Sequence, residues 1–188
     1  GASKLAADKI FVAANSLASE SGTRFAVVRY GNVIGSRGSI VPFFRELIAE
    51  GAEALPITDP RMTRFWITLD DGVEFVLSSL AMMKRAEIFV PKIPSMSIVD
   101  IASAMAPGLP QKTIGIRPGE KLHEVMITED DARNTINLPD RFIIRPTLYP
   151  EWCVGYHPEE TELEDGFRYA SDNNDQWLDK DAFLAMLD

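Results

Sequence analysis

The chain has 188 residues, of which 46% are apolar and 25% are charged, and its formal net charge is −9. This composition excludes disordered and fibrous proteins and predicts one domain or two small lobes around a buried core. The acidic balance disfavours nucleic-acid binding, which requires clustered Lys and Arg side chains.

The sequence lacks a membrane span, a signal sequence and a disulfide framework, which indicates a cytoplasmic protein without a membrane partner. No apolar run approaches the about 18 residues of a membrane span, and no basic and then apolar signal sequence is present. The single cysteine, Cys153, excludes an internal disulfide framework and suits a reducing compartment, and we expect a buried, inert thiol.

The first predicted element is a helix at the N-terminus. Apolar residues recur at helical spacing from Leu5 to Leu17, with Lys4 and Lys9 among them. No capping residue precedes this helix, which is unusual for the start of a domain. We therefore expect residues 1–4 to continue a longer protein, of which this chain is the C-terminal part.

A glycine-rich segment, residues 29–39, follows a short apolar strand at residues 25–28. Its glycines let backbone N–H groups approach a ligand, and Arg37 adds a forked cation. A surface turn fits this spacing equally well.

A helix is predicted directly after the glycines, from Ile40 to Glu50, with Ser39 as its N-cap and Gly51 as its stop. A strand, a glycine loop and a helix N-terminus together form the arrangement by which α/β proteins hold anionic groups. This segment is the first candidate site.

The second candidate site is an aromatic strand with arginines, residues 61–67. Thr68 or Asp70 then caps a helix over residues 71–83, in which Met82 and Met83 fill gaps in the core. The buried stripe of this helix is expected to be Val73, Val76, Leu77 and Leu80. Further strands are predicted at 87–90, 113–116 and 141–144, and further helices at 97–105 and 182–187.

The third candidate site is the segment of residues 117–124, in which a rigid Pro-Gly turn follows Arg117. Arg117 can chelate a phosphate through parallel hydrogen bonds, and Glu120 can bind a sugar hydroxyl or orient the arginine. Glu120 and Lys121 are expected to open a short helix, although a surface turn with local ion pairs is the alternative. His123 has no histidine nearby, so no metal site is predicted.

Five motifs in this order resemble the extended short-chain dehydrogenase/reductases, and they lie at residues 1–4, 29–39, 62–66, 87–95 and 117–121. The chain is most similar to the inverting UDP-N-acetylglucosamine 4,6-dehydratases that start pseudaminic acid synthesis for surface glycans or flagellin. Retaining UDP-sugar dehydratases and epimerases of the same superfamily are the alternative. A non-catalytic sugar-nucleotide-binding or peptide-binding module remains open as a reading from another class.

The resemblance implies a lyase that depends on NADP, with NAD not excluded. NADP would oxidise the sugar at C4, water would leave across C5 and C6, and hydride would return to C6 with inversion at C5. Lys4 would hold the nicotinamide ribose and lower the pKa of a tyrosine just before Gly1, and Val33 would contact the cofactor. The residues implied to bind the UDP-sugar are Asn32, Arg37, Gly38, Ser39, Ile40, Val41, Arg64, Arg117 and Glu120.

The fold implied is α/β, namely the C-terminal part of an NAD(P)-binding Rossmann fold plus a small α/β substrate-binding lobe. Residues 1–55 would be the last Rossmann elements, and residues 56–188 mainly the substrate lobe and a C-terminal tail. The glycine fingerprint, an Asp-Lys acid–base pair and the catalytic tyrosine are expected upstream, so we expect the chain alone to be inactive. The resemblance also implies a homo-oligomer built through the helices near residues 5–17 and 73–80.

Overall fold

A computed structural model describes residues 2–18 and 22–187, so Gly1 of the first motif lies outside the described residues. The chain forms two compact units, each assembled from three separate segments. Unit 1 comprises residues 1–30, 73–92 and 126–168, and unit 2 comprises residues 31–72, 93–125 and 169–188. The units therefore alternate along the chain, whereas the sequence suggested a single boundary after residue 55.

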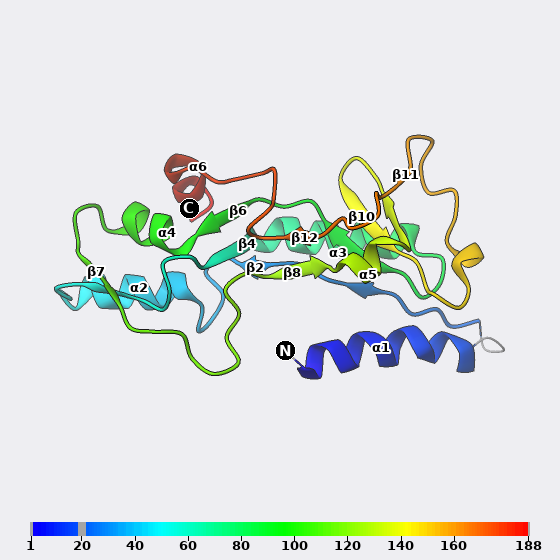
Figure 1. Cartoon of the computed structure of the whole chain (residues 1–188), viewed down its shortest axis with the longest axis horizontal. Coiled ribbons are helices and arrows are strands. Elements are labelled where there is room, and N and C mark those ends of the chain that lie inside the picture. Colours follow the sequence, from blue (N-terminus) through cyan, green and yellow to red (C-terminus); the bar gives the residue numbers. More distant parts are fainter. Residues whose placement is uncertain (1, 19–21, 188) are drawn as a thin grey trace. The chain divides into compact units, whose positions relative to one another are not determined.

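Unit 1 is built on a mixed sheet in the order β1-β5-β10-β9-β11, of which Figure 1 labels β10 and β11. β1 pairs with β5 in parallel, and the other neighbours pair antiparallel. Its elements are α1 (Ala2–Leu17), β1 (Val27–Val28), most of α3 (Leu69–Met82), β5 (Ile88–Pro91), most of β8 (Val125–Ile127), α5 (Glu129–Ala132), β9 (Thr135–Asn137), β10 (Arg141–Ile144), the 3-10 turn η1 (Pro150–Trp152) and β11 (Thr161–Glu162).

β5 is an interior strand of this sheet, and every residue in it is buried. A continuous apolar run is typical of a strand that is covered on both faces. Phe89 of β5 lies opposite Ile143 of β10, and both belong to the core cluster with Phe75 of α3. Met82 and Met83 pack against this cluster, which confirms the expectation that they fill the core.

Unit 2 contains a sheet in the order β2-β4-β6 and a parallel pair, β3-β7 (Figure 1). β4 pairs with β2 in parallel and with β6 antiparallel. Its elements are β2 (Asn32–Val33), α2 (Ile40–Ala49), β3 (Leu55–Ile57), β4 (Thr63–Ile67), β6 (Ser95–Ser97), α4 (Ile98–Met105), β7 (Gln111–Thr113), β12 (Tyr169–Ala170) and α6 (Lys180–Ala185).

The core of unit 2 lies among β3, β4 and the helices α2, α4 and α6. Trp66 packs edge-on against Phe183 of α6, with ring centroids 5.9 Å apart. α4 begins where the sequence predicts, because the Ser97 side chain accepts a hydrogen bond from the Asp100 N–H and so caps the first turn. This cap fixes the end of β6 and the start of α4 at adjacent residues.

The buried stripe predicted for α3 is wrong. Its four members are among the exposed apolar residues of the described chain: Val73, Val76, Leu77 and Leu80. α3 instead buries Phe75 and Ser79. α3 carries apolar residues on two faces. The face that packs against the sheet of unit 1 is the one that contains Phe75.

None of the described helices is long and apolar enough to cross a membrane.

Candidate functional site

Part of the glycine-rich segment is a strand rather than a loop. β2 pairs with β4 in the register Asn32↔Trp66 and Val33↔Ile67. Gly31 permits this pairing, since a Cβ at its position would lie 2.5 Å from the Cβ of Phe65. Only glycine allows the two backbones to approach this closely. The close approach fixes the backbone position of Asn32, which is the next residue.

The carboxylate of Glu124 joins two parts of unit 2 that are far apart in sequence. Asn32 Nδ2 donates to Glu124 Oε1 at 3.2 Å and Oε2 at 3.3 Å, and also to the Phe65 carbonyl at 3.3 Å. The Phe65 N–H donates to Glu124 Oε2 at 3.1 Å. Glu124 therefore connects the predicted asparagine site to the loop that carries Arg117 and Glu120.

A chain of hydroxyl groups supports Glu124 from behind. The Glu124 N–H donates to Ser171 Oγ at 2.9 Å, and Ser171 Oγ lies 2.7 Å from Thr63 Oγ1. His123 Nδ1 also lies 2.9 Å from Thr63 Oγ1. Neither Thr63 nor Ser171 was predicted to be a site residue. Across residues 2–18 and 22–187, no group of at least three His, Cys, Asp or Glu side chains could bind a metal ion.

The guanidinium of Arg64 holds the same loop through backbone carbonyl groups. Its Nη1 donates to the carbonyls of Thr63 at 2.7 Å and Leu122 at 2.9 Å, and its Nη2 donates to that of Lys121 at 3.0 Å. Arg64 is half-buried, and two of the carbonyls that it binds, those of residues 121 and 122, directly follow the turn that contains Arg117 in sequence. These bonds make Arg64 an anchor of the loop.

Arg117 and Glu120 form a local turn. The Arg117 N–H donates to Glu120 Oε2 at 3.2 Å, and the Arg117 side chain is exposed. The short helix expected at Glu120 and Lys121 is wrong, because the described chain has no helix between α4 and α5. The Pro-Gly turn is followed by irregular backbone, with Gly119 at a φ of 81°. Arg117 is thus presented from a loop.

The N-terminus of α2 carries the other predicted ligand contacts. Arg37 and Gly38 are exposed, whereas Val41 is fully buried in the core of unit 2, so its side chain is not available to a ligand. Ser39 occupies the N-cap position but makes no capping bond. Its Oγ is buried and has no hydrogen-bond partner among the described residues. An orphaned hydroxyl beside helix N–H groups is a feature that a bound anion would satisfy.

Lys4 belongs to the other unit. It lies on α1 with an exposed side chain. One turn later on the same helix, Asp8 accepts a bond of 2.8 Å from Arg29 Nε, and Arg29 also pairs with Asp131 at 3.2 Å. These ion pairs fix α1 within unit 1 and leave the Lys4 ammonium outside the pair network.

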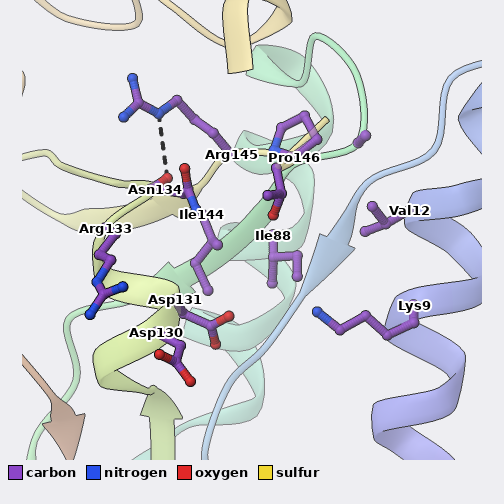
Figure 2. A pocket seen from close by; sticks show the side chains of 12 residues that line it. Lys9, Val12, Ile88, Asp130, Asp131, Arg133, Asn134, Ile144, Arg145 and Pro146 are labelled. Atoms are coloured by element: carbon purple, nitrogen blue, oxygen red, sulfur yellow. Dashed lines mark hydrogen bonds between the residues drawn. The ribbon is translucent and has the colours of Figure 1, made fainter. Parts of the chain in front are cut away.

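Unit 1 also contains a cavity of about 370 Å³ with an apolar floor that includes Val12 and Ile88 (Figure 2). Lys9 reaches into it from α1, opposite charged groups of both signs. Arg145 is already bonded to Glu162 at 2.8 Å, and Asp131 to Arg29. Two of the charged groups around the cavity are therefore compensated by ion pairs within unit 1.

A family model described as "Polysaccharide biosynthesis protein" matches residues 1–146. The chain belongs to this family. It is 53% identical over 193 residues to a Campylobacter jejuni protein named "UDP-N-acetylglucosamine 4,6-dehydratase (inverting)", a match that covers 100% of the chain and 58% of the relative. A Rickettsia canadensis "UDP-glucose 4-epimerase" is 37% identical over 92% of the chain and 52% of its own length. The chain thus spans little more than half of these relatives, and the resemblance indicated by the motifs is confirmed.

Solved structures confirm the α/β fold. Pen from Bacillus thuringiensis matches with a TM-score of 0.82 and 32% identity, over 97% of the chain and 54% of Pen. DesIV from Streptomyces venezuelae, a dTDP-glucose 4,6-dehydratase with NAD and TYD bound, matches with a TM-score of 0.54 and 21% identity, over 64% of the chain and 39% of DesIV. At that identity the likeness to DesIV concerns the fold alone, which is the Rossmann-type fold expected from the motifs.

Proposed function

We propose that this chain is the nucleotide-sugar-binding part of an inverting UDP-N-acetylglucosamine 4,6-dehydratase. The observation that carries the proposal is the 53% identity, along the whole chain, to the Campylobacter jejuni enzyme of that name. The geometry of unit 2 supports it, because Glu124 joins Asn32 to the segment that carries Arg117, and Arg64 binds the Leu122 carbonyl of the same segment. The reaction itself is a property we assign to the longer protein that includes this chain.

The proposed ligand is a UDP-sugar, and its charge explains which residues would bind it. The chain is acidic overall, so a diphosphate requires a local cation, and Arg117 is an exposed one on a loop. The orphaned Ser39 hydroxyl at the N-terminus of α2 would supply a further donor. Asn32 and Glu120 are proposed to bind the remaining polar groups of the ligand, together with the backbone of residues 37–41.

The proposed cofactor is NADP, with NAD as the alternative, and DesIV is a relative by fold whose structure contains NAD. A bound nicotinamide cofactor would supply hydride-transfer chemistry, with oxidation of the sugar at C4 and return of the hydride to C6. Lys4 is proposed to donate a hydrogen bond to a ribose hydroxyl of the cofactor, and its side chain is exposed. Val33, half-buried in β2, is proposed as an apolar contact. The work of this chain is to bind and orient the sugar nucleotide, and Lys4 would hold a positive charge near the reacting tyrosine.

The second candidate function is 4-epimerisation of a UDP-sugar, which the 37% identity to the Rickettsia canadensis epimerase favours. The two reactions differ in their products. A dehydratase releases a 4-keto-6-deoxy sugar that absorbs in the ultraviolet at high pH, whereas an epimerase releases a sugar without a ketone. Incubation of the full-length protein with UDP-N-acetylglucosamine followed by this absorbance, and by separation of the products, distinguishes them. A 4-epimer without any keto sugar would refute the dehydratase proposal.

Binding is tested separately from turnover by titrating the same protein with UDP in a calorimeter. Arg117→Ala is expected to weaken binding by about 2 kcal/mol, the loss of one charge-assisted pair. Arg61→Ala is the matched control, since Arg61 is an exposed arginine of unit 2 that pairs with Asp59 at 2.8 Å. Equal affinities for the two variants would reject the role of Arg117.

A further inference from the structure

The bonds of Glu124 to Asn32 and Phe65 suggest a role that the motifs did not assign. Glu124 lies 92 positions after Asn32 and is half-buried beside it. Its two oxygens face the amide Nδ2 of Asn32 and the backbone N–H of Phe65. Phe65 is fully buried, so without Glu124 its N–H would lose its partner.

These contacts determine how the Asn32 amide is oriented. The groups around Nδ2 are the Glu124 carboxylate and the Phe65 carbonyl, and both are acceptors only. The NH2 end of the amide must therefore face them, because the opposite orientation would place the amide oxygen against a carboxylate. The two ends of an asparagine amide have the same shape, so only such a partner selects one of them.

Glu124 itself has little freedom to move away. Its N–H donates to Ser171 Oγ at 2.9 Å, and its carbonyl accepts from the Ser171 N–H at 2.9 Å. Ser171 is fully buried. The carboxylate is thus presented from a backbone that is bonded on both sides, directly after the loop that the Arg64 guanidinium anchors.

We propose that Glu124 is a positioning residue of the nucleotide-sugar site: by fixing the Asn32 amide against β4, it sets the orientation in which Asn32 meets the ligand. This inference rests on the proposed function for the identity of the ligand. Glu124 acts through Asn32 and does not itself touch the sugar nucleotide. Its loss raises KM and leaves kcat nearly unchanged, because the interaction supports binding of substrate and transition state alike.

The test compares Glu124→Gln with the parent in the full-length protein. Glutamine keeps the volume but offers either an oxygen or an NH2 group, so it no longer selects one orientation of the Asn32 amide. We expect KM for UDP-N-acetylglucosamine to rise about tenfold, the scale of one charge-assisted hydrogen bond, with kcat within about twofold. Glu53→Gln, an exposed glutamate of unit 2, is the matched control and leaves both constants unchanged.

A double-mutant cycle with Asn32→Ala separates positioning from a general structural effect. If Glu124 acts through Asn32, then Glu124→Gln has little further effect on KM once Asn32 is removed. An equal tenfold loss in both backgrounds, or an unchanged or lower KM for Glu124→Gln alone, overturns the inference. Failure of the proposed function is recognised differently, since the parent would then neither bind UDP nor turn over the sugar nucleotide.

Discussion

Gly31 and Phe65 lie so close together that a Cβ on Gly31 would be 2.5 Å from the Phe65 Cβ and 2.6 Å from its carbonyl oxygen. Neither neighbour is the flexible end of a side chain, so the backbone must move if a methyl group is added. Gly31→Ala is therefore expected to destabilise the fold by about 1–3 kcal/mol, as overpacking does, and to displace Asn32 from Glu124. Urea unfolding measures the first effect and UDP titration the second.

Gly72→Ala is the control for this substitution. Gly72 lies in α3, and a Cβ at its position would have no heavy atom within 4 Å. Alanine in a helix is favoured over glycine by about 0.5–1 kcal/mol, so this variant is expected to be as stable as the parent or more stable. If both alanine variants unfold at the same urea concentration as the parent, then the close approach at Gly31 does not constrain the fold.

Helices were predictable because their ends carry chemical signals. α2 ends before Gly51, whose φ is 76°, and α4 begins at the Ser97 cap, as expected. Strands of two or three residues gave no such signal, since alternation cannot be recognised over β2, β9 or β11. The two units were also not separable by sequence, because each one collects three segments of the chain.

The candidate site was predictable only as far as its residues belong to local motifs. Asn32 and Arg117 were found because each stands in a characteristic run of neighbours. Glu124 lies in the third candidate site but was given no role, because its partner Asn32 is 92 positions away and no spacing in one sequence reports such a contact. Arg64 was found, but its bonds to the carbonyls of Lys121 and Leu122 depend on how the loop folds back.

Cys153 is expected to be unreactive in the folded protein. Its side chain is fully buried, its Sγ donates to the Arg85 carbonyl at 3.1 Å, and burial raises the pKa of the thiol to about 11. Because the thiolate is the reactive form, a thiol reagent at pH 8 should modify the protein only after denaturation. Cys153 is the single cysteine of this chain, so a mass measurement of its peptide reads the result directly. Rapid modification of the native protein would contradict this burial.

The Cys153 thiol also makes the free energy of unfolding depend on pH, and the direction of this dependence follows from its raised pKa. The folded state keeps the proton up to a pKa of about 11, whereas an unfolded thiol loses it near about 8.5. The folded state therefore binds more protons in this window, and the free energy of unfolding should fall as the pH rises from about 8.5 to about 11. Cys153→Ala should lessen this fall, because the variant has no thiol to ionise in the unfolded state.

Arg141 is expected to be a charged residue of unit 1 whose loss clearly lowers the free energy of unfolding. Its guanidinium is buried over the Phe75 ring, 4.7 Å from the centroid, and donates to Ser79 Oγ at 3.1 Å and to Asp140 Oδ2 at 2.6 Å. Arg141→Ala removes these bonds and leaves a cavity beside α3, so we expect a loss of about 2 kcal/mol in urea unfolding. Arg133→Ala is the control, because Arg133 pairs with Asp165 at 3.4 Å through exposed side chains and should contribute less than about 1 kcal/mol. Similar losses for both variants would contradict the importance of burial.

The exposed apolar residues of α3 are expected to form a contact between copies of the full-length protein. Leu77 is 60% exposed and Leu80 is 63% exposed, and they lie on one face of α3 with Val73 and Val76. A row of apolar side chains along one helix is more than the single exposed apolar residues that monomers commonly carry. Packing of such helices across a twofold axis would bury the same surface on both copies.

Leu77→Glu should therefore shift the full-length protein toward the monomer, since it places a carboxylate in the expected contact. Light scattering at micromolar concentration measures the mass, and a melting curve checks that the variant is folded. Leu148→Glu is the matched control, because Leu148 is 80% exposed but lies outside the helices, and it should leave the mass unchanged. If the parent is already monomeric, or if Leu77→Glu keeps the oligomer intact, then α3 does not form the contact. The exposure of its apolar face would then require another cause.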